Sequence, residues 1–224
     1  MNTNIAKIVA DINRRYVQRG TLGVIVFGSV ARGSFDRFSD IDIYVLKKFK
    51  PPYSREGDII NGIRTDVLID GRKDAWQFLR RERNQVRRNF SHMIAHGKIV
   101  YENGDEIKKL QKEAINNLKL KTHFTGDELR MHLYSIDDFY QEILRFQSRT
   151  DRFAFEQNRT LLINNIIECF LKVKGDYFRR PNEMQAIFKK HDKKFADLIK
   201  RWYNGQTIPA KARNATILVK HIYA

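Results

Sequence analysis

The feature that most constrains the fold of this chain is a pair of short apolar segments, one followed by Gly-Ser and the other flanked by aspartates. Residues 24–27 form an apolar run that ends at Gly28-Ser29, and residues 41–46 form a second run beside Asp40 and Asp42. Short apolar runs bounded by turn residues predict buried strands. Side chains two positions apart lie on the same face of a strand, so the two aspartates project together.

A third strand is predicted over residues 63–69, where apolar and polar positions alternate. Asp66 lies on its polar face together with Arg64, which could pair with a carboxylate or contact a phosphate. If this strand pairs with the one that carries Asp42, facing side chains lie about 5 Å apart at Cβ. Carboxylates that close repel each other, and a hard divalent cation such as magnesium relieves the repulsion. The alternative for Asp66 is an exposed acid on a strand surface.

The whole pattern is Gly28-Ser29, a gap from Val30 to Ser39, the segment Asp40-Ile41-Asp42-Ile43 and then Asp66 on a later strand. It resembles the motif of the DNA polymerase β-like nucleotidyltransferase superfamily. The resemblance covers residues 20–70 closely and extends loosely to about residue 118. It implies a two-domain enzyme similar to kanamycin nucleotidyltransferase, which transfers an NMP from an NTP to a hydroxyl group and releases pyrophosphate. ATP is the expected donor.

The resemblance also implies roles for the three acids. Asp40, Asp42 and Asp66 would bind Mg²⁺, with two ions expected, and Asp66 would take the proton of the acceptor hydroxyl. Paired metal ions clamp the attacking and leaving oxygens of an in-line displacement, so little covalent chemistry is asked of the protein. The alternative is an Asp-capped strand whose acids face solvent.

The nucleotide would be held by residues that precede the acids. The resemblance implies that Gly28 and Ser29 hold the β- and γ-phosphates. Arg32 and Ser39 lie between the two halves of the motif and are further candidates for nucleotide binding. Arg37 is placed as Arg32 is, and a solvated loop position is the alternative for both arginines.

Periodicity organises the rest of the chain. It predicts a helix from Ile5 to Tyr16, one or two helices up to residue 97, a strand at 98–101 and a helix from about 106 to 118. After Thr125 strand signals vanish, and helices are predicted near 129–144, at 151–174 and, as two further helices, after Pro181. The predicted fold class is α+β: a small mixed β-sheet with flanking helices, followed by an all-α helical bundle. The nucleotidyltransferase domain is predicted over residues 1–118, and the bundle, implied to bind the acceptor, over residues 125–224.

The bundle carries few residues with an evident chemical role. Gln157, Asn164 and Glu168 share one face of a predicted helix, where they either line a pocket or face solvent. Glu156 or Glu168 is an alternative general base. Cys169, the single cysteine, lies in an apolar stretch and is expected in the core.

Charge bears on the acceptor. The net charge of +16 is spread along the chain, and a cluster of arginines between residues 80 and 88 forms either a basic strip or solvated helix faces. A basic surface attracts polyanions, which favours RNA, including tRNA, or another acidic acceptor over a polycationic aminoglycoside. The acceptor is therefore open between RNA and a small molecule, and the sequence is compatible with an oligomer.

Location and alternative functions complete the expectations. No secretory signal pattern and no apolar stretch long enough to span a membrane occur in the sequence, so a cytoplasmic protein without a membrane partner is expected. One alternative function is a nucleotidyltransferase-fold partner in a toxin–antitoxin or RNA-binding complex, and another is nucleic-acid binding by charge alone. The three acids favour an enzyme, because clustered carboxylates without a cation would repel each other for no structural gain.

Overall fold

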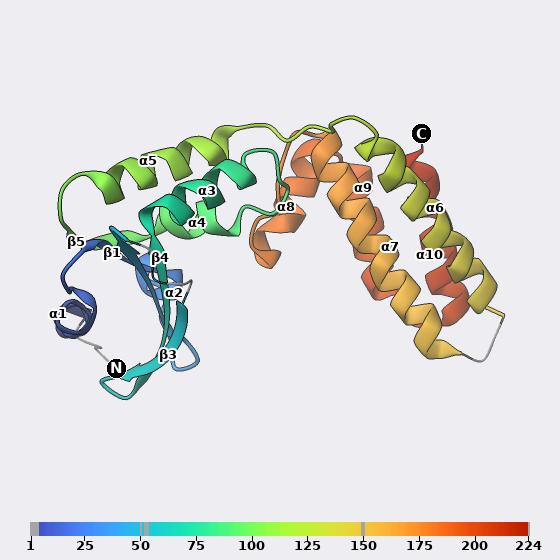
Figure 1. The fold of residues 1–224 in the computed structure, drawn as a ribbon. Helices are drawn as coiled ribbons and strands as arrows, with labels where there is room; N and C mark the ends of the chain where they lie inside the picture. The colour runs from blue at the N-terminus through green and yellow to red at the C-terminus, as the bar shows by residue number, and fades with distance from the viewer. Residues whose placement is uncertain (1–4, 50, 52–53, 149–150, 224) are drawn as a thin grey trace. The chain divides into compact units, whose positions relative to one another are not determined.

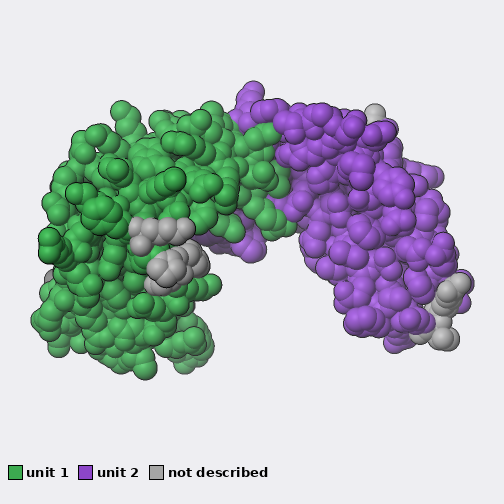
Figure 2. All heavy atoms as spheres, in the orientation of Figure 1, with its two compact units in different colours: residues 1–120 green, residues 121–224 purple. Residues whose placement is uncertain are grey.

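The structure, a computed structural model, describes residues 5–49, 51, 54–148 and 151–223. The chain divides into two compact units, residues 1–120 (unit 1) and 121–224 (unit 2), which Figure 2 shows in different colours. Unit 1 mixes strands and helices, and the described part of unit 2 contains helices without strands (Figure 1). The predicted α+β fold class is confirmed.

Unit 1 contains five strands and five helices within its described residues. In chain order they are α1 (Ile5–Tyr16), β1 (Thr21–Phe27), α2 (Gly28–Arg32), β2 (Ile41–Lys47), β3 (Ser54–Ile60), β4 (Ile63–Gly71), α3 (Arg72–Glu82), α4 (Asn89–His96), β5 (Lys98–Glu102) and α5 (Glu106–Lys119). The strands form one sheet in the order β3-β4-β2-β1-β5. Only β2 and β4 run parallel; the other neighbours are antiparallel. The sheet is therefore mixed, as predicted.

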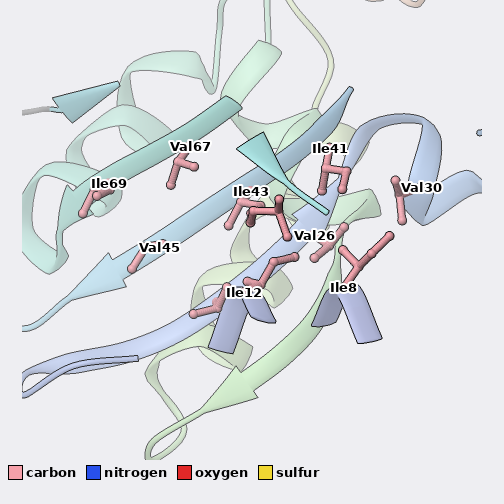
Figure 3. Packing of buried hydrophobic residues seen from close by; sticks show 11 residues of the cluster. Ile8, Ile12, Val26, Val30, Ile41, Ile43, Val45, Val67 and Ile69 are labelled. Carbon is pink, nitrogen blue, oxygen red and sulfur yellow. The ribbon is translucent and has the colours of Figure 1, made fainter. Parts of the chain in front are cut away.

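Each face of the sheet carries its own core. On one face Ile8 and Ile12 of α1 join one core with alternate residues of the central strands, and Figure 3 shows them beside Val26 and Ile43. On the other face, residues of α3, α4 and α5 pack against the remaining positions of β1 and β2 (Figure 1). The alternation predicted for β2 and β4 thus holds, and it directs Asp42 and Asp66 away from the α1 core. The side chain of Ile5, predicted on the apolar face of α1, lies outside the described residues.

Strand β3 has no counterpart in the sequence prediction. It forms a hairpin with β4 through Asn61-Gly62, where both residues have positive φ, 52° and 75°. Asn-Gly between apolar residues is a strong hairpin signal, and it could have predicted this strand. The prediction failed because β3 is an edge strand whose residues 55–57 are exposed, so it lacks a buried, alternating face.

Unit 2 contains α6 (Glu128–Phe146), α7 (Arg152–Val173), α8 (Pro181–His191), α9 (Lys193–Asn204) and α10 (Ile208–Ile222). Three helices follow residue 180 where the sequence predicted two. Asp192 separates α8 from α9: its backbone is extended and its carboxylate accepts a hydrogen bond from Phe195 N. A single capping residue ends one helix and starts the next while the spacing of the apolar residues continues, so this spacing alone does not predict the boundary between α8 and α9.

Cys169 is buried in α7, as expected. No helix among the described residues is both long and apolar enough to cross a membrane.

One residue of the predicted basic strip is structural. Arg88 is fully buried, and its guanidinium donates to the backbone oxygens of Arg83, Gln85, Asn117 and Leu120. The guanidinium is therefore neutralised inside unit 1 by backbone carbonyl groups near helix ends, which lack a partner within their own helix. The neighbouring Arg83 pairs with Glu113 at 2.7 Å. The arginines at 80–88 therefore do not form one continuous exposed strip.

Candidate active site

The predicted acidic residues meet where β1 ends and β2 begins. Phe27, the last residue of β1, pairs with Asp42 of β2, and Asp42 in turn pairs in register with Asp66 of the parallel strand β4. Asp40 precedes β2 and is exposed. Adjacent strands bring paired side chains of one face to within contact range. We call this border of the sheet, which is formed by strand ends and carries Asp40, Asp42 and Asp66, the acidic end.

Gly28 touches the central carboxylate. Its φ is +67°, in the region that favours glycine, and a Cβ built on it would lie 1.8 Å from Oδ2 of Asp42. A side chain at this position would collide with the carboxylate and would strain the backbone. The glycine thus lets the main chain of the turn approach Asp42 directly.

Ser29 and Arg32 lie on the short helix α2 that follows this turn. The Oγ atom of Ser29 is buried and has no hydrogen-bond partner among the described residues. A buried hydroxyl without a partner is costly, so this donor fits a ligand that accepts a hydrogen bond. Arg32, the last residue of α2, is exposed, and its positive charge acts on Asp42.

The acidic end is short of positive charge. The pKa of Asp42 is raised to about 6, first by burial and then by the charges of Asp40 and Asp66, while Arg32 and Arg55 oppose the shift. The half-buried carboxylate is thus destabilised in its ionised form. Carboxylate oxygens near neutral pH, with too few cations around them, have the donor chemistry of a magnesium site.

Arg55 is the functional candidate that sequence reasoning missed. Its Nε and Nη2 atoms donate to the two carboxylate oxygens of Asp66 at 2.9 and 2.7 Å. Arg55 reaches Asp66 from β3, the strand that was not predicted, while Arg64, the expected partner on the same strand, is exposed. Both oxygens of Asp66 are therefore engaged by a guanidinium in this structure.

Ser39, which is predicted to bind nucleotide, forms a turn with Asp36. Its hydroxyl donates to Oδ1 of Asp36 at 2.9 Å and accepts from Asp36 N, which closes the turn before Asp40. The hydrogen bond from the backbone N–H of Phe38 and the one from the Ser39 hydroxyl lower the pKa of Asp36. In this structure the hydroxyl of Ser39 stabilises the turn that precedes Asp40.

The side chains of the three aspartates are not arranged around a common position for a metal ion in this structure. No group of three His, Cys, Asp or Glu side chains in the described ranges is arranged to hold a metal ion. Asp66 is held by Arg55, and Asp40 stands at the exposed start of β2. The oxygen donors, the raised pKa of Asp42 and the close approach of Gly28 still fit a divalent cation, provided that Asp66 exchanges its partner.

Comparison with known proteins agrees with this geometry. The model of the nucleotidyltransferase domain family matches residues 5–181, which include the whole acidic end, α6 and α7. The chain belongs to the nucleotidyltransferase family. This confirms the resemblance at the level of the superfamily and assigns the protein the general activity of that family, transfer of a nucleotidyl group. No curated protein matches the sequence.

The fold of this nucleotidyltransferase is similar to that of a solved structure. That structure is the crystal structure of a nucleotidyltransferase-like protein from Exiguobacterium sibiricum 255-15, with a TM-score of 0.57 and 15% sequence identity. The match covers 97% of this chain and 74% of that chain. At this identity the similarity concerns the fold.

The three polar residues predicted on one helix face in the second unit of the nucleotidyltransferase differ in exposure, and Glu168 is partly buried in α7. Gln157 and Asn164 are exposed on α7. Glu156 is bound by Arg159 at 2.7 Å and by Lys211 at 2.6 Å, and although burial opposes it, these contacts lower its pKa. A carboxylate held by two cations is a poor proton acceptor, so Glu156 is not favoured as the general base.

Proposed function

We propose that the protein transfers an NMP from an NTP, ATP in the first instance, to a hydroxyl group of an acceptor, with Mg²⁺ at the acidic end. The observation that carries the proposal is the contact of Gly28 with Asp42. It places a phosphate-sized glycine turn directly against a carboxylate that is paired with a second one. Such a juxtaposition supports binding of a phosphate and a cation side by side.

Each residue has a distinct task in this proposal. Asp40 and Asp42 hold the cation, which supplies Lewis-acid stabilisation of charge on the phosphates. Ser29 donates its unpartnered hydroxyl to a phosphate oxygen, and Arg32 adds positive charge near Asp42. These groups bind and orient the triphosphate, which is the main contribution a protein makes to phosphoryl-type transfer.

The bond changes balance as follows. The acceptor oxygen forms a bond to the α-phosphorus, the bond from that phosphorus to the oxygen bridging to the β-phosphorus breaks, and pyrophosphate leaves. The proton of the acceptor hydroxyl passes to a carboxylate oxygen of Asp66. Asp66 must first be released by Arg55, because the guanidinium engages both oxygens. The acceptor is proposed as an RNA, including tRNA, or a small molecule, and the basic charge supports the first.

The test is transfer of radiolabel from each α-labelled NTP to separate panels of tRNA, other RNA, small molecules and protein, with Mg²⁺. Label should enter one class of acceptor and should disappear in Asp40→Asn/Asp42→Asn. A suitable control is Asp105→Asn, an exposed aspartate of unit 1 at the start of α5, which should keep the activity of the wild type. No label above the Asp40→Asn/Asp42→Asn background with any NTP would contradict the proposal and favour a role as a binding partner.

A further inference from the structure

The opposite edge of the same sheet, formed by the other ends of its strands, carries a second cluster of charged side chains. There the carboxyl ends of β2, β4 and β5 lie beside the start of β1: Thr21 and Gly71 both pair with Lys47, and Asn103 N donates to Leu22 O. The carboxyl ends of neighbouring parallel strands are a common place for ligands. This edge is lined by none of the residues of the acidic end.

A cavity of about 560 Å³ lies at this edge, and three cations line it: Arg19, Lys48 and Arg72. We call this set the basic end. Each cation comes from a segment next to a different strand, β1, β2 or β4. Cavities of this size are typical of sites for small organic ligands. The topology of the sheet, rather than closeness in sequence, brings the three charges together.

None of these three cations forms an ion pair within the described part of the chain. The one carboxylate in the lining is Glu106, and it accepts a hydrogen bond from Trp76 Nε1 at 2.8 Å. Three cations therefore face one carboxylate around a single cavity. Some other exposed arginines of unit 1 do have acidic partners, such as Arg15 with Asp58 and Arg83 with Glu113. The excess of positive charge at the basic end calls for an anion.

An exposed aromatic ring stands beside these charges. Phe49 is 74% exposed and lines the same cavity, with Lys48 Nζ at 5.3 Å from the centre of its ring. Leaving a phenyl ring in water is unfavourable, and an aromatic face next to cations is the usual composition of a site that stacks a base and neutralises its phosphate. A simple inorganic anion has no aromatic surface that could stack on the ring of Phe49.

We propose that the basic end is a second nucleotide-binding site, in which Arg19, Lys48 and Arg72 contact phosphate and Phe49 stacks on the base. The nucleotide is either free or one unit of an RNA strand, since both present a base beside a phosphate. In the second case an RNA would be held at the edge of the sheet opposite to the acidic end. The site requires no divalent cation, because the protein itself supplies the positive charge.

The test measures fluorescence anisotropy of two probes with the full-length protein in EDTA at low salt. One probe is ADP with a methylanthraniloyl group on the ribose, and the other is a labelled single-stranded RNA of about 12 nucleotides. We expect Arg19→Ala/Arg72→Ala to weaken binding by about tenfold or more, and Phe49→Ala by about threefold to tenfold. Arg19→Lys/Arg72→Lys should recover part of the affinity, because it keeps the charge.

Two control variants separate this site from diffuse attraction and from the acidic end. Lys112→Ala/Lys119→Ala removes the same charge from exposed positions of α5 and should change affinity by less than about twofold. Asp40→Asn/Asp42→Asn, which should abolish transfer, should not weaken probe binding. Thermal melting of every variant checks that each remains folded.

The outcomes are distinct. Specific loss of ADP binding identifies a free nucleotide as the ligand, and specific loss of RNA binding alone identifies an RNA strand. Equal losses in the two alanine double variants, no binding of either probe by the wild-type protein, or loss of binding in Asp40→Asn/Asp42→Asn would each overturn the proposal. Because the assay contains no divalent cation, failure of the proposed transferase reaction would not affect its result.

Discussion

The two ends of one sheet differ in charge and in how the sequence encodes them. The acidic end is built from a glycine turn and three aspartates within residues 28–66, and two of these aspartates pair across adjacent strands. The basic end gathers cations from residues 19, 48 and 72, which belong to no local motif. A site made from one turn and two neighbouring strands leaves a pattern in the sequence. A site made from the ends of several strands becomes evident only when the strand order is known.

The comparison also concerns neutralisation. At the acidic end burial and, after it, the like charges of Asp40 and Asp66 raise the pKa of Asp42, and the guanidinium of Arg55 is hydrogen-bonded to Asp66. At the basic end three cations share one carboxylate that is already hydrogen-bonded. Both ends therefore carry charge that the protein does not balance itself, of opposite sign. Uncompensated charge is a cost to folding, which is commonly retained where a ligand restores the balance.

The largest effect should come from removing charge at the centre of the acidic end. We expect Asp42→Asn to lower nucleotidyl transfer about a thousandfold, because it removes a ligand of the cation and its charge. Without metal the same variant should be more stable than the wild type at pH 8, by about 1 kcal/mol after allowance for solvent screening. The pKa of Asp42 is raised, so the gain should be absent below about pH 4, should grow between about pH 4 and about pH 6 and should level off above that. Activity assays and urea denaturation across this pH range measure both; equal stability of the two proteins at pH 8 would contradict the electrostatic account.

A methyl group at the turn should have the next largest effect. Gly28→Ala places a Cβ against Oδ2 of Asp42, so we expect transfer to fall about a hundredfold or more. Gly33→Ala is a matched control, since Gly33 also has a positive φ, +71°, but a Cβ there meets no atom within 4 Å. It should cost about 1 kcal/mol of stability through backbone strain and leave activity nearly unchanged. Steady-state kinetics and thermal melting of both variants test this; similar losses of activity would assign the effect to strain alone.

How far sequence reasoning reached depended on the kind of signal. The strands that carry Asp42 and Asp66, their pairing and the helical second half were predicted, because buried elements have strong apolar periods. The edge strand β3 was missed, and Arg55 with it, because exposed residues carry no such period. Nucleotide binding by Ser39, inferred from its place in the motif, stays a prediction; the hydrogen bond of its hydroxyl to Asp36 was not predicted. Hydrogen bonds within a loop depend on backbone geometry that residue spacing does not specify.

The charge cluster at 80–88 illustrates the same limit. Adjacent arginines look alike in sequence, but Arg88 is buried among backbone carbonyls and Arg83 pairs with Glu113. The three cations of the basic end are far apart in sequence and could not be grouped before the strand order was known. Composition therefore predicted that this protein is basic, but not where positive charge remains unpaired.

A smaller effect should follow from releasing Asp66. Arg55→Ala removes the guanidinium that competes for both carboxylate oxygens, so we expect Mn²⁺, as a probe of the magnesium site, to bind about two- to fivefold more tightly. Arg64→Ala, on the exposed neighbouring position of β4, should leave Mn²⁺ affinity unchanged. Titration followed by electron paramagnetic resonance measures free Mn²⁺ directly. Weaker binding in Arg55→Ala would mean that Arg55 orients Asp66 for the cation rather than competing with it.

The smallest effect should come from Asp70, the next-to-last residue of β4, close to the basic end. This carboxyl is buried, and burial raises its pKa to about 6, while Tyr44 opposes the shift and Asp74 adds to it. Because the pKa is raised in the folded protein, ionisation of Asp70 costs stability as the pH rises from about 4 to about 6. Asp70→Asn should therefore stabilise the protein by about 1 kcal/mol at pH 8 and have little effect below about pH 4. Asp105→Asn is the control, because a hydrogen bond from Lys109 lowers the pKa of that exposed carboxylate and no gain is expected. Urea denaturation at several pH values decides the matter: a gain that does not depend on pH would come from packing at position 70, and only a gain that grows between about pH 4 and about pH 6 would show that the sheet carries a buried charge beside the basic end.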